Sequence, residues 1–123
     1  MKIKLLPLDK LFSRFIRLRA NGVCERCGKP TPFERLQCSH FHGRRKKSVR
    51  WNEDNACALC FHCHQHLGEN PLEHTEWYRK KIGNEKFVLL EIQAGQIVKP
   101  NQVLVKLYLE QKLAEIIAEG KCG

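Results

Sequence analysis

Residues 24–27 read Cys-Glu-Arg-Cys and residues 60–64 read Cys-Phe-His-Cys-His, and these two stretches decide the fold of the chain. Two thiolate pairs, each separated by two residues, supply the tetrahedral four-sulfur set that Zn²⁺ prefers. The 32 residues between the pairs are too many for a minimal zinc loop, so the metal must hold two distant segments together. The pattern therefore predicts a structural zinc site whose ligands are Cys24, Cys27, Cys60 and Cys63.

Other cysteines complicate this interpretation. Cys57 also lies three residues before Cys60, which offers an overlapping second pair. Cys60 and Cys63 are preferred as ligands because they directly precede His64 and the helix predicted there. We expect Cys38 and Cys57 to be small buried side chains, and Cys122 to be a free thiol. An iron–sulfur cluster is the alternative cofactor.

The composition of the 123 residues predicts a single domain that spans residues 1–123 and needs zinc to supplement a modest core. Seven cysteines, an odd number, fit poorly with a complete set of disulfides. We find no signal peptide and no apolar run of membrane length, so we expect a cytoplasmic protein with no membrane partner. Reducing surroundings favour metal binding by paired cysteines over disulfide formation.

Charge is unevenly distributed along the chain. Residues 1–50 contain 14 Lys and Arg against 3 acidic residues, a balance of +11, whereas residues 51–123 contain 8 against 10, a balance of −2. A basic half joined to a nearly neutral half is typical of a protein that binds a polyanion. No segment combines a clean apolar face with this charge, so nucleic acid is a better candidate partner than a membrane surface.

Hydrophobic periodicity predicts an α+β protein with a small zinc-stapled ββα core at residues 24–68. A basic helix is expected at 8–20, with Asp9 as its N-cap. Strands are expected at 36–41 and 48–51, followed by a short helix that begins at residues 64–67. A helical extension is expected at 73–119, with helices at 73–82 and 85–92. Residues 102–119 fit either a strand or a helix, and the cap residue Asn101 favours a helix.

Three polar residues within or next to the predicted core form a nuclease-like set. His40 ends the first predicted strand, Asn55 follows 15 residues later, and His64 follows after another 9. Phosphodiester hydrolysis needs a base to activate water and a Lewis acid on the phosphate. Imidazole suits the base because its pKa lies near working pH. This spacing predicts His40 as the base, Asn55 as a positioning residue and His64 as a ligand of a divalent metal.

These motifs resemble those of the HNH, or ββα-metal, endonucleases. The resemblance rests on the two cysteine pairs, on Cys-Ser-His-Phe at residues 38–41, on Trp-Asn-Glu-Asp-Asn at 51–55 and on His64. Within that superfamily the chain resembles the NinG (Rap) recombination proteins of lambda-like bacteriophages. Leu-Asp-Lys-Leu-Phe-Ser at 8–13, His-Leu-Gly at 66–68 and Trp-Tyr-Arg-Lys-Lys-Ile-Gly at 77–83 extend it over roughly residues 8–92.

The resemblance implies an endonuclease that acts on branched or recombining DNA inside a bacterial host cell. It assigns His40 as general base, Asn55 as positioning residue and His64 as ligand of the catalytic metal. Many HNH enzymes have an aspartate or histidine directly before the base, where this chain has Ser39. His42 is the best substitute ligand, and Asp54 is another. A sparse protein ligand set suits a hydrated Mg²⁺ or Mn²⁺ ion that also binds the substrate phosphate.

A run of cations separates the predicted base from Asn55. Residues 43–50 read Gly-Arg-Arg-Lys-Lys-Ser-Val-Arg and contain five positive charges. Such a run can simply be solvated, but its place beside the site favours contact with DNA phosphates, which position a substrate without reading its sequence. The predicted DNA contacts are Arg44, Arg45, Lys46, Lys47 and Arg50.

Two other functions fit the same residues. Ser39 in place of an acid favours a non-catalytic zinc module that binds nucleic acid and recruits a recombination partner. A nuclease that cuts RNA is the third hypothesis. The apolar stripe of the last helix is a possible homodimer interface, although packing of that helix on its own core explains the stripe equally well.

Overall fold

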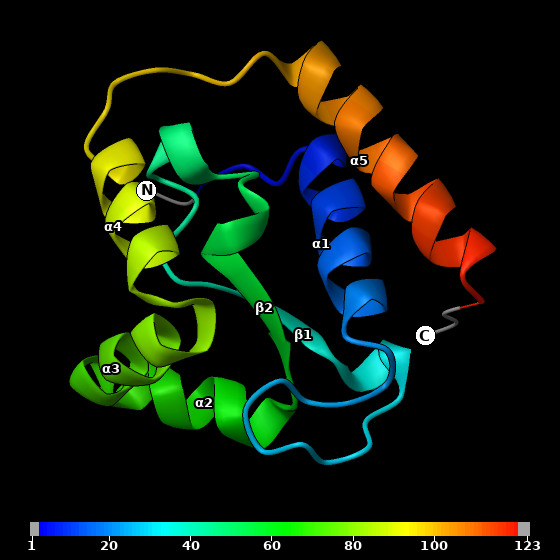
Figure 1. Cartoon of the computed structure of the whole chain (residues 1–123), viewed down its shortest axis with the longest axis vertical. Helices are drawn as coiled ribbons and strands as arrows, with labels where there is room; N and C mark the ends of the chain where they lie inside the picture. Colours follow the sequence, from blue (N-terminus) through cyan, green and yellow to red (C-terminus); the bar gives the residue numbers. More distant parts are fainter. Residues whose placement is uncertain (1–2, 121–123) are drawn as a thin grey trace.

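The computed structural model describes residues 3–120, so Cys122 lies outside the described residues. Within residues 3–120 a two-stranded antiparallel sheet lies between two groups of helices (Figure 1). The α+β class is therefore confirmed. In chain order the elements are α1 (Pro7–Arg19), η1 (Phe33–Arg35), β1 (Gln37–His40), η2 (Lys47–Val49), η3 (Glu53–Asn55), β2 (Ala56–Leu59), α2 (Phe61–Glu69), α3 (Pro71–Ile82), α4 (Asn84–Ala94) and α5 (Gln102–Ala118).

Helix α1 packs against one face of the sheet. Its apolar residues recur at helical spacing, and Phe12, Phe15 and Ile16 are almost completely buried. The predicted cap is wrong by one turn. The helix begins at Pro7 and the capping residue is Leu6, whose backbone N–H donates to Asp9 Oδ2 at 2.7 Å. Proline fixes the backbone for the first helical position, which explains the earlier start.

The hairpin forms with a different second strand from the one predicted. The segment 48–51 is not a strand but lies in η2 and the turn after it, and β1 pairs with β2. Gln37 faces Leu59, and His40 faces Ala56. Strand β2 therefore leads directly into Cys60, which places the second cysteine pair at the end of the hairpin.

Helices α2, α3 and α4 cover the opposite face. Cys60 caps α2, because its Sγ accepts a hydrogen bond from the Cys63 N–H at 3.5 Å. Helix α3 ends before Gly83, whose φ of 89° lies in the left-handed region that favours glycine. The side chains under these helices form a second core, which includes Leu59, Leu67, Tyr78 and Leu90.

The last helix, α5, packs on α1 and not on the sheet (Figure 1). Asn101 caps it by accepting a hydrogen bond from the Leu104 N–H at 3.1 Å, so the helical prediction for residues 102–119 is confirmed. Leu109, Leu113 and Ile116 bury its apolar stripe in the core of the same chain. Within residues 3–120, no helix has the length and apolar character needed to cross a membrane.

Candidate functional site: a four-cysteine cluster and a basic histidine cleft

The two cysteine pairs meet where the segment after α1 reaches the start of α2. The Sγ atoms of Cys24, Cys27, Cys60 and Cys63 all lie within 4.8 Å of one another. Four converging thiols fit a tetrahedral zinc ion. The converging sulfurs are those of the two predicted pairs, whereas Cys57 is fully buried in the sheet and lies outside this group. The cluster is therefore a site that can hold a structural metal ion such as zinc.

Arg26 donates hydrogen bonds to two of the four sulfur atoms. The backbone N–H of Arg26 donates to Cys24 Sγ at 3.5 Å, and its guanidinium Nη1 donates to Cys63 Sγ at 3.4 Å. The same guanidinium donates through Nη2 to Glu73 Oε2 at 2.9 Å, which ties the cluster to α3. Hydrogen bonds of this kind favour the thiolate form that metal binding requires.

The pKa values of two thiols move in opposite directions. Burial opposes ionisation of Cys24, but backbone hydrogen bonds from Cys27, Cys60 and Arg26 outweigh it and lower the pKa to about 7. Burial and the neighbouring sulfurs raise the pKa of Cys63 to about 12, against the effect of Arg26. A bound divalent cation supplies the positive charge that allows all four sulfurs to be thiolates.

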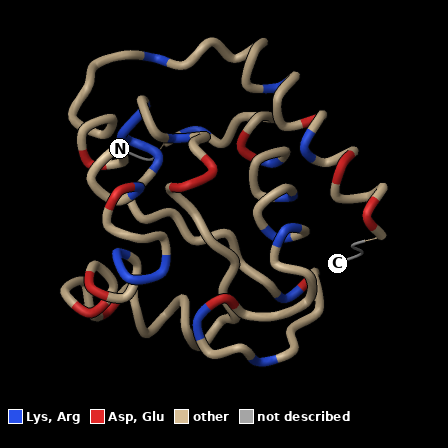
Figure 2. Tube along the Cα trace, in the orientation of Figure 1, with Lys and Arg blue, Asp and Glu red and all other residues tan. Residues whose placement is uncertain are grey.

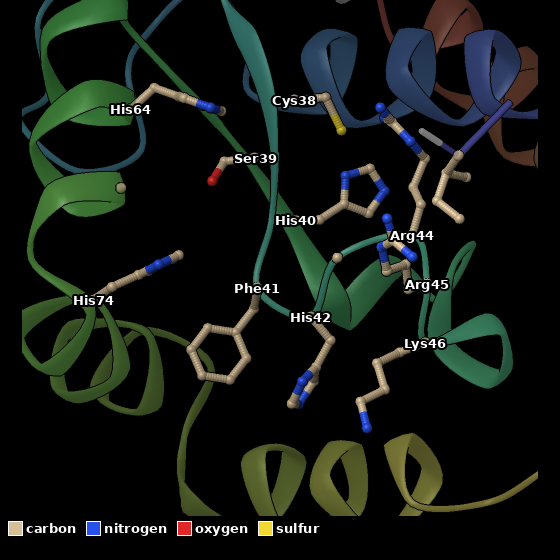
Figure 3. Close-up of a pocket in the computed structure, with 13 residues that line it drawn as sticks. Cys38, Ser39, His40, Phe41, His42, Arg44, Arg45, Lys46, His64 and His74 are labelled. Carbon is tan, nitrogen blue, oxygen red and sulfur yellow. The ribbon is translucent and has the colours of Figure 1, made fainter. Parts of the chain in front are cut away.

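An open cleft of about 920 Å³ follows β1 and the loop after it (Figure 3). Strand β1 pairs with β2 along one edge. Residues from both sides of β1 line the cleft at the end of this strand. The lining residues are mostly histidines and cations: Ile3, Cys38, Ser39, His40, Phe41, His42, Gly43, Arg44, Arg45, Lys46, His64, Gly68 and His74.

His40 enters the cleft from the side of α1. Its ring lies 5.5 Å from the Phe12 ring between centroids, and its Nε2 is buried without a hydrogen-bond partner among the described residues. Burial lowers the pKa of His40 below its ordinary value of 6.5, and the positive charge of Arg44 lowers it further, while a hydrogen bond to the Arg50 backbone opposes both. Because Nε2 has no partner, Nδ1 is the atom that faces the Arg50 carbonyl. The lowered pKa favours the neutral form of His40, and its Nε2 has no partner among the described residues.

Asn55 is completely buried behind this loop. Its Oδ1 accepts the N–H of His42 at 2.8 Å, and its Nδ2 donates to the His42 carbonyl at 2.8 Å and to the Val49 carbonyl at 3.1 Å. Three hydrogen bonds to the backbone fix both ends of the loop that follows His40. Asn55 therefore acts on the shape of the cleft and does not line it.

His64 and His74 enter the cleft from the other side of β1, where Figure 3 shows both side chains directed into the same space. His64 stands on the first turns of α2, and its Nδ1 is buried without a partner among the described residues. His74 stands on α3, and burial together with the nearby His64 lowers its pKa. Sequence reasoning assigned no role to His74, because no ligand spacing links it to His64.

The proposed substitute ligands do not lie beside His64. His42 turns toward α4, where its Nε2 lies 2.6 Å from Glu91 Oε1 (Figure 3). Asp54 lies outside the cleft, 3.9 Å from the Nζ of Lys86. Strand β1 ends at His40, so the alternation of side chains along the strand does not determine the direction of His42. Ser39 is the strand residue on the side of His64 (Figure 3).

The basic loop divides into two parts. Arg44, Arg45 and Lys46 line the cleft, and Figure 2 shows that Lys and Arg positions gather along this stretch. Lys47 is exposed in η2 next to them. Placing Arg50 with them was wrong. Its side chain is 7% exposed, and its Nη2 lies 2.6 Å from Asp9 Oδ2, because a buried guanidinium needs a buried partner.

The Asp9 carboxylate accepts several hydrogen bonds at that ion pair. Arg50 Nε and Trp51 Nε1 both donate to Asp9 Oδ1 at 2.9 Å. Burial raises the pKa of the Asp9 carboxyl, but the bonds from Arg50, Leu6 and Trp51 outweigh this effect and hold the pKa below its usual value. The Asp9–Arg50 ion pair anchors the start of α1 to the end of the basic loop, whose Arg50 backbone bonds to His40.

The fold and the site together define a small α+β protein with a four-cysteine cluster that can bind metal and a basic, histidine-lined cleft. The sequence profile of the family described as bacteriophage lambda NinG protein matches residues 5–115. The chain therefore belongs to the NinG family. Comparisons with curated proteins and with solved structures found no match.

Proposed function

We propose that this protein is a divalent-metal-dependent DNA endonuclease of the HNH (ββα-metal) type. The observation that carries the proposal is the state of His40, whose free Nε2 and lowered pKa suit a general base. The order hairpin, then α2, with a cysteine cluster at its base supports the HNH assignment. Membership of the NinG family supports a role in bacteriophage recombination, and branched or recombination-intermediate DNA is the substrate we propose.

In this mechanism His40 Nε2 accepts a proton from a water molecule as the water oxygen attacks the phosphorus. The bond from phosphorus to the leaving sugar oxygen then breaks, and that oxygen takes up a proton from solvent. The Arg50 carbonyl holds the imidazole, and Asn55 holds the loop that supports it. His64 is positioned to hold a divalent cation on the other side of β1. Such an ion, when bound, stabilises negative charge on the phosphate.

The cations beside His40 are proposed to hold the DNA backbone. Arg44, Arg45 and Lys46 lie along one wall of the cleft, where phosphate contacts would bring a phosphodiester bond to His40 Nε2. Lys47, which is exposed in the adjacent turn, extends this surface. Such contacts give an affinity that depends on salt and only weakly on base sequence.

The test compares wild type with His40→Ala on a supercoiled plasmid and on a four-way junction, with Mg²⁺, Mn²⁺, Ni²⁺ or EDTA. We expect metal-dependent cleavage by wild type, preferential cutting of the junction, and at least about a hundredfold slower cleavage by the variant. His62→Ala is the matched control, because His62 is exposed on α2 and does not line the cleft. Cleavage by His40→Ala at the wild-type rate would refute the base assignment.

A non-catalytic nucleic-acid-binding module is the second candidate, and one observation favours it. Among the described residues that line the cleft, none is Asp or Glu, so the carboxylates typical of Mg²⁺ nucleases are missing there. DNA binding by both wild type and His40→Ala, with cleavage by neither under any metal, would support this second function. Preferential cutting of RNA would instead redirect the nuclease proposal to another substrate.

A further inference from the structure

His64 and His74 extend side by side from their helices into the same part of the cleft (Figure 3). Gly68, one turn after His64 on α2, lines this space, and a Cβ placed on it would meet nothing within 4 Å. His74 comes from α3 and is directed into the same space (Figure 3). Residues i and i+4 share a face of a helix, so Gly68 lies beside His64 on α2 but has no side chain that could bind a metal. His74 supplies an imidazole on that side from α3.

The position of His74 is fixed by packing. Its ring makes an edge contact with Phe41, with 5.3 Å between centroids, and a second edge contact with Tyr78 at 6.3 Å. Phe41 and Tyr78 stack on each other at 5.0 Å, so His74 rests on a rigid aromatic base. A ligand held in this way loses little conformational freedom when a metal binds, which favours binding.

The donors around this space are nitrogen and hydroxyl oxygen. His64 Nδ1 is buried and has no partner among the described residues, and Ser39 lies on the same side of β1. Imidazole donors suit later transition metals, whereas Mg²⁺ takes carboxylates, phosphates and water. The absence of Asp and Glu from the described lining of the cleft is consistent with the same preference.

We propose that His64 and His74 together hold a transition-metal ion in the cleft, with affinity in the order Ni²⁺, Mn²⁺, Mg²⁺ from tightest to weakest. The inference that this ion is the catalytic metal rests on the proposed nuclease function. As a binding site, it stands without that function. The order follows from the general rise in affinity of nitrogen sites from Mn²⁺ to Ni²⁺. The ion approaches the cleft from the side opposite His40, which leaves His40 Nε2 free for a proton.

The experiment uses the full chain with its cysteine cluster loaded with one equivalent of zinc. The measurement is made twice: once without DNA, and once with the His40→Ala protein bound to uncleaved DNA. Calorimetry measures the binding of Ni²⁺, Mn²⁺ and Mg²⁺, and line broadening by Mn²⁺ in histidine NMR spectra identifies the nearest rings. The variants are His64→Ala and His74→Phe, and the latter keeps an aromatic ring against Phe41 and Tyr78. His62→Ala is the control, since His62 is exposed and lies away from the cleft.

We expect the Ni²⁺ dissociation constant to rise about tenfold or more in His64→Ala and in His74→Phe, and to stay unchanged in His62→Ala. Mn²⁺ should broaden the signals of His64 and His74 before those of His62 and His66. Wild-type affinity in His74→Phe, with loss in His64→Ala, would overturn the role of His74 and leave the nuclease proposal intact. Mg²⁺ binding as tight as Ni²⁺ binding would overturn the metal preference. Tight Ni²⁺ binding through both rings in a protein that never cleaves DNA would support this site and contradict the nuclease.

Discussion

The cysteine cluster and the histidine cleft lie on the same small scaffold but differ in their donor atoms and in how open they are. The cluster brings four sulfur atoms within 4.8 Å of one another, and N–H donors surround them. The cleft takes one imidazole each from β1, from the loop after it, from α2 and from α3. Two of these rings keep a buried nitrogen without a partner among the described residues.

In the proposed function, this difference separates a structural site from a reactive one. A metal with four sulfur ligands has no open position, so it can hold segments together but cannot bind a substrate. A cleft with few protein ligands leaves positions for water and phosphate. The predictions below test this division of roles, beginning with the cluster.

Removal of one cysteine ligand should produce the largest effect. Cys60→Ser takes a sulfur from the cluster, while the serine hydroxyl can still cap α2. Structural zinc in small domains contributes on the order of 10 kcal/mol to folding, so we expect loss of zinc and of cooperative thermal unfolding. The measurement is zinc content by elemental analysis together with circular dichroism on heating.

Cys57→Ala is the matched control for that experiment. Cys57 is completely buried, whereas Cys60 is half-buried, and Cys57 lies in β2, outside the cluster. It should keep one zinc per chain and lose only about 1 kcal/mol of unfolding free energy, as expected for a small cavity. One zinc per chain and an unchanged melting temperature in Cys60→Ser would contradict the structural role of the cluster.

The second prediction separates Arg50 from its neighbours. Arg50→Met leaves the buried Asp9 carboxylate without its ion pair and should lower the free energy of unfolding by about 3–5 kcal/mol. Arg44→Met, at a half-buried position in the cleft, should change it by less than about 1 kcal/mol. Urea denaturation measures both values, and equal losses would show that Arg50 is not a structural residue.

The third prediction concerns DNA affinity. Arg44→Ala combined with Arg45→Ala removes two cations from the cleft wall and should reduce the slope of log affinity against log salt by about 2. Fluorescence anisotropy with a labelled duplex at several salt concentrations measures this slope. The double variant should weaken binding equally for unrelated sequences. An unchanged slope and affinity would remove the loop from the proposed DNA surface.

The smallest predicted effect is a shift in pH dependence. In the proposed mechanism cleavage needs neutral His40, so the acid limb of the rate profile should report the pKa of His40, which burial and Arg44 lower below 6.5. The charge of Arg44 lowers that pKa, so Arg44→Ala should stabilise the imidazolium form and move the acid limb to higher pH. Single-turnover rates from pH 4.5 to pH 8 test the direction. A shift to lower pH would contradict the electrostatic role of Arg44.

The sequence predicted the cysteine cluster because zinc ligands have a fixed local spacing. It also predicted α1, α3, α4 and α5 through their apolar periodicity and end signals. The second strand was misplaced because Ser-Val-Arg-Trp at 48–51 has stronger strand propensity than Ala-Cys-Ala-Leu at 56–59. Burial on both faces and the connection to Cys60 override that propensity.

The cleft was harder to predict because its properties depend on long-range contacts. Arg50 looked like any other cation of its run, since its partner Asp9 lies 41 residues away. The positions of His42 and His74 also depend on contacts with distant residues. The end of β1 turns His42 toward Glu91, and the packing of α3 beside α2 brings His74 to the cleft. No spacing rule in a single sequence encodes either contact.

The most direct test loads the protein with one zinc per chain and measures plasmid nicking while a second metal, Ni²⁺ or Mn²⁺, is added. The account predicts a folded protein that does not cleave with zinc in the cysteine cluster alone. It also predicts nicking that saturates with the second metal and disappears in His40→Ala. Nicking that needs no second metal, or DNA binding without nicking at any metal concentration, would contradict the division between a structural cluster and a reactive cleft.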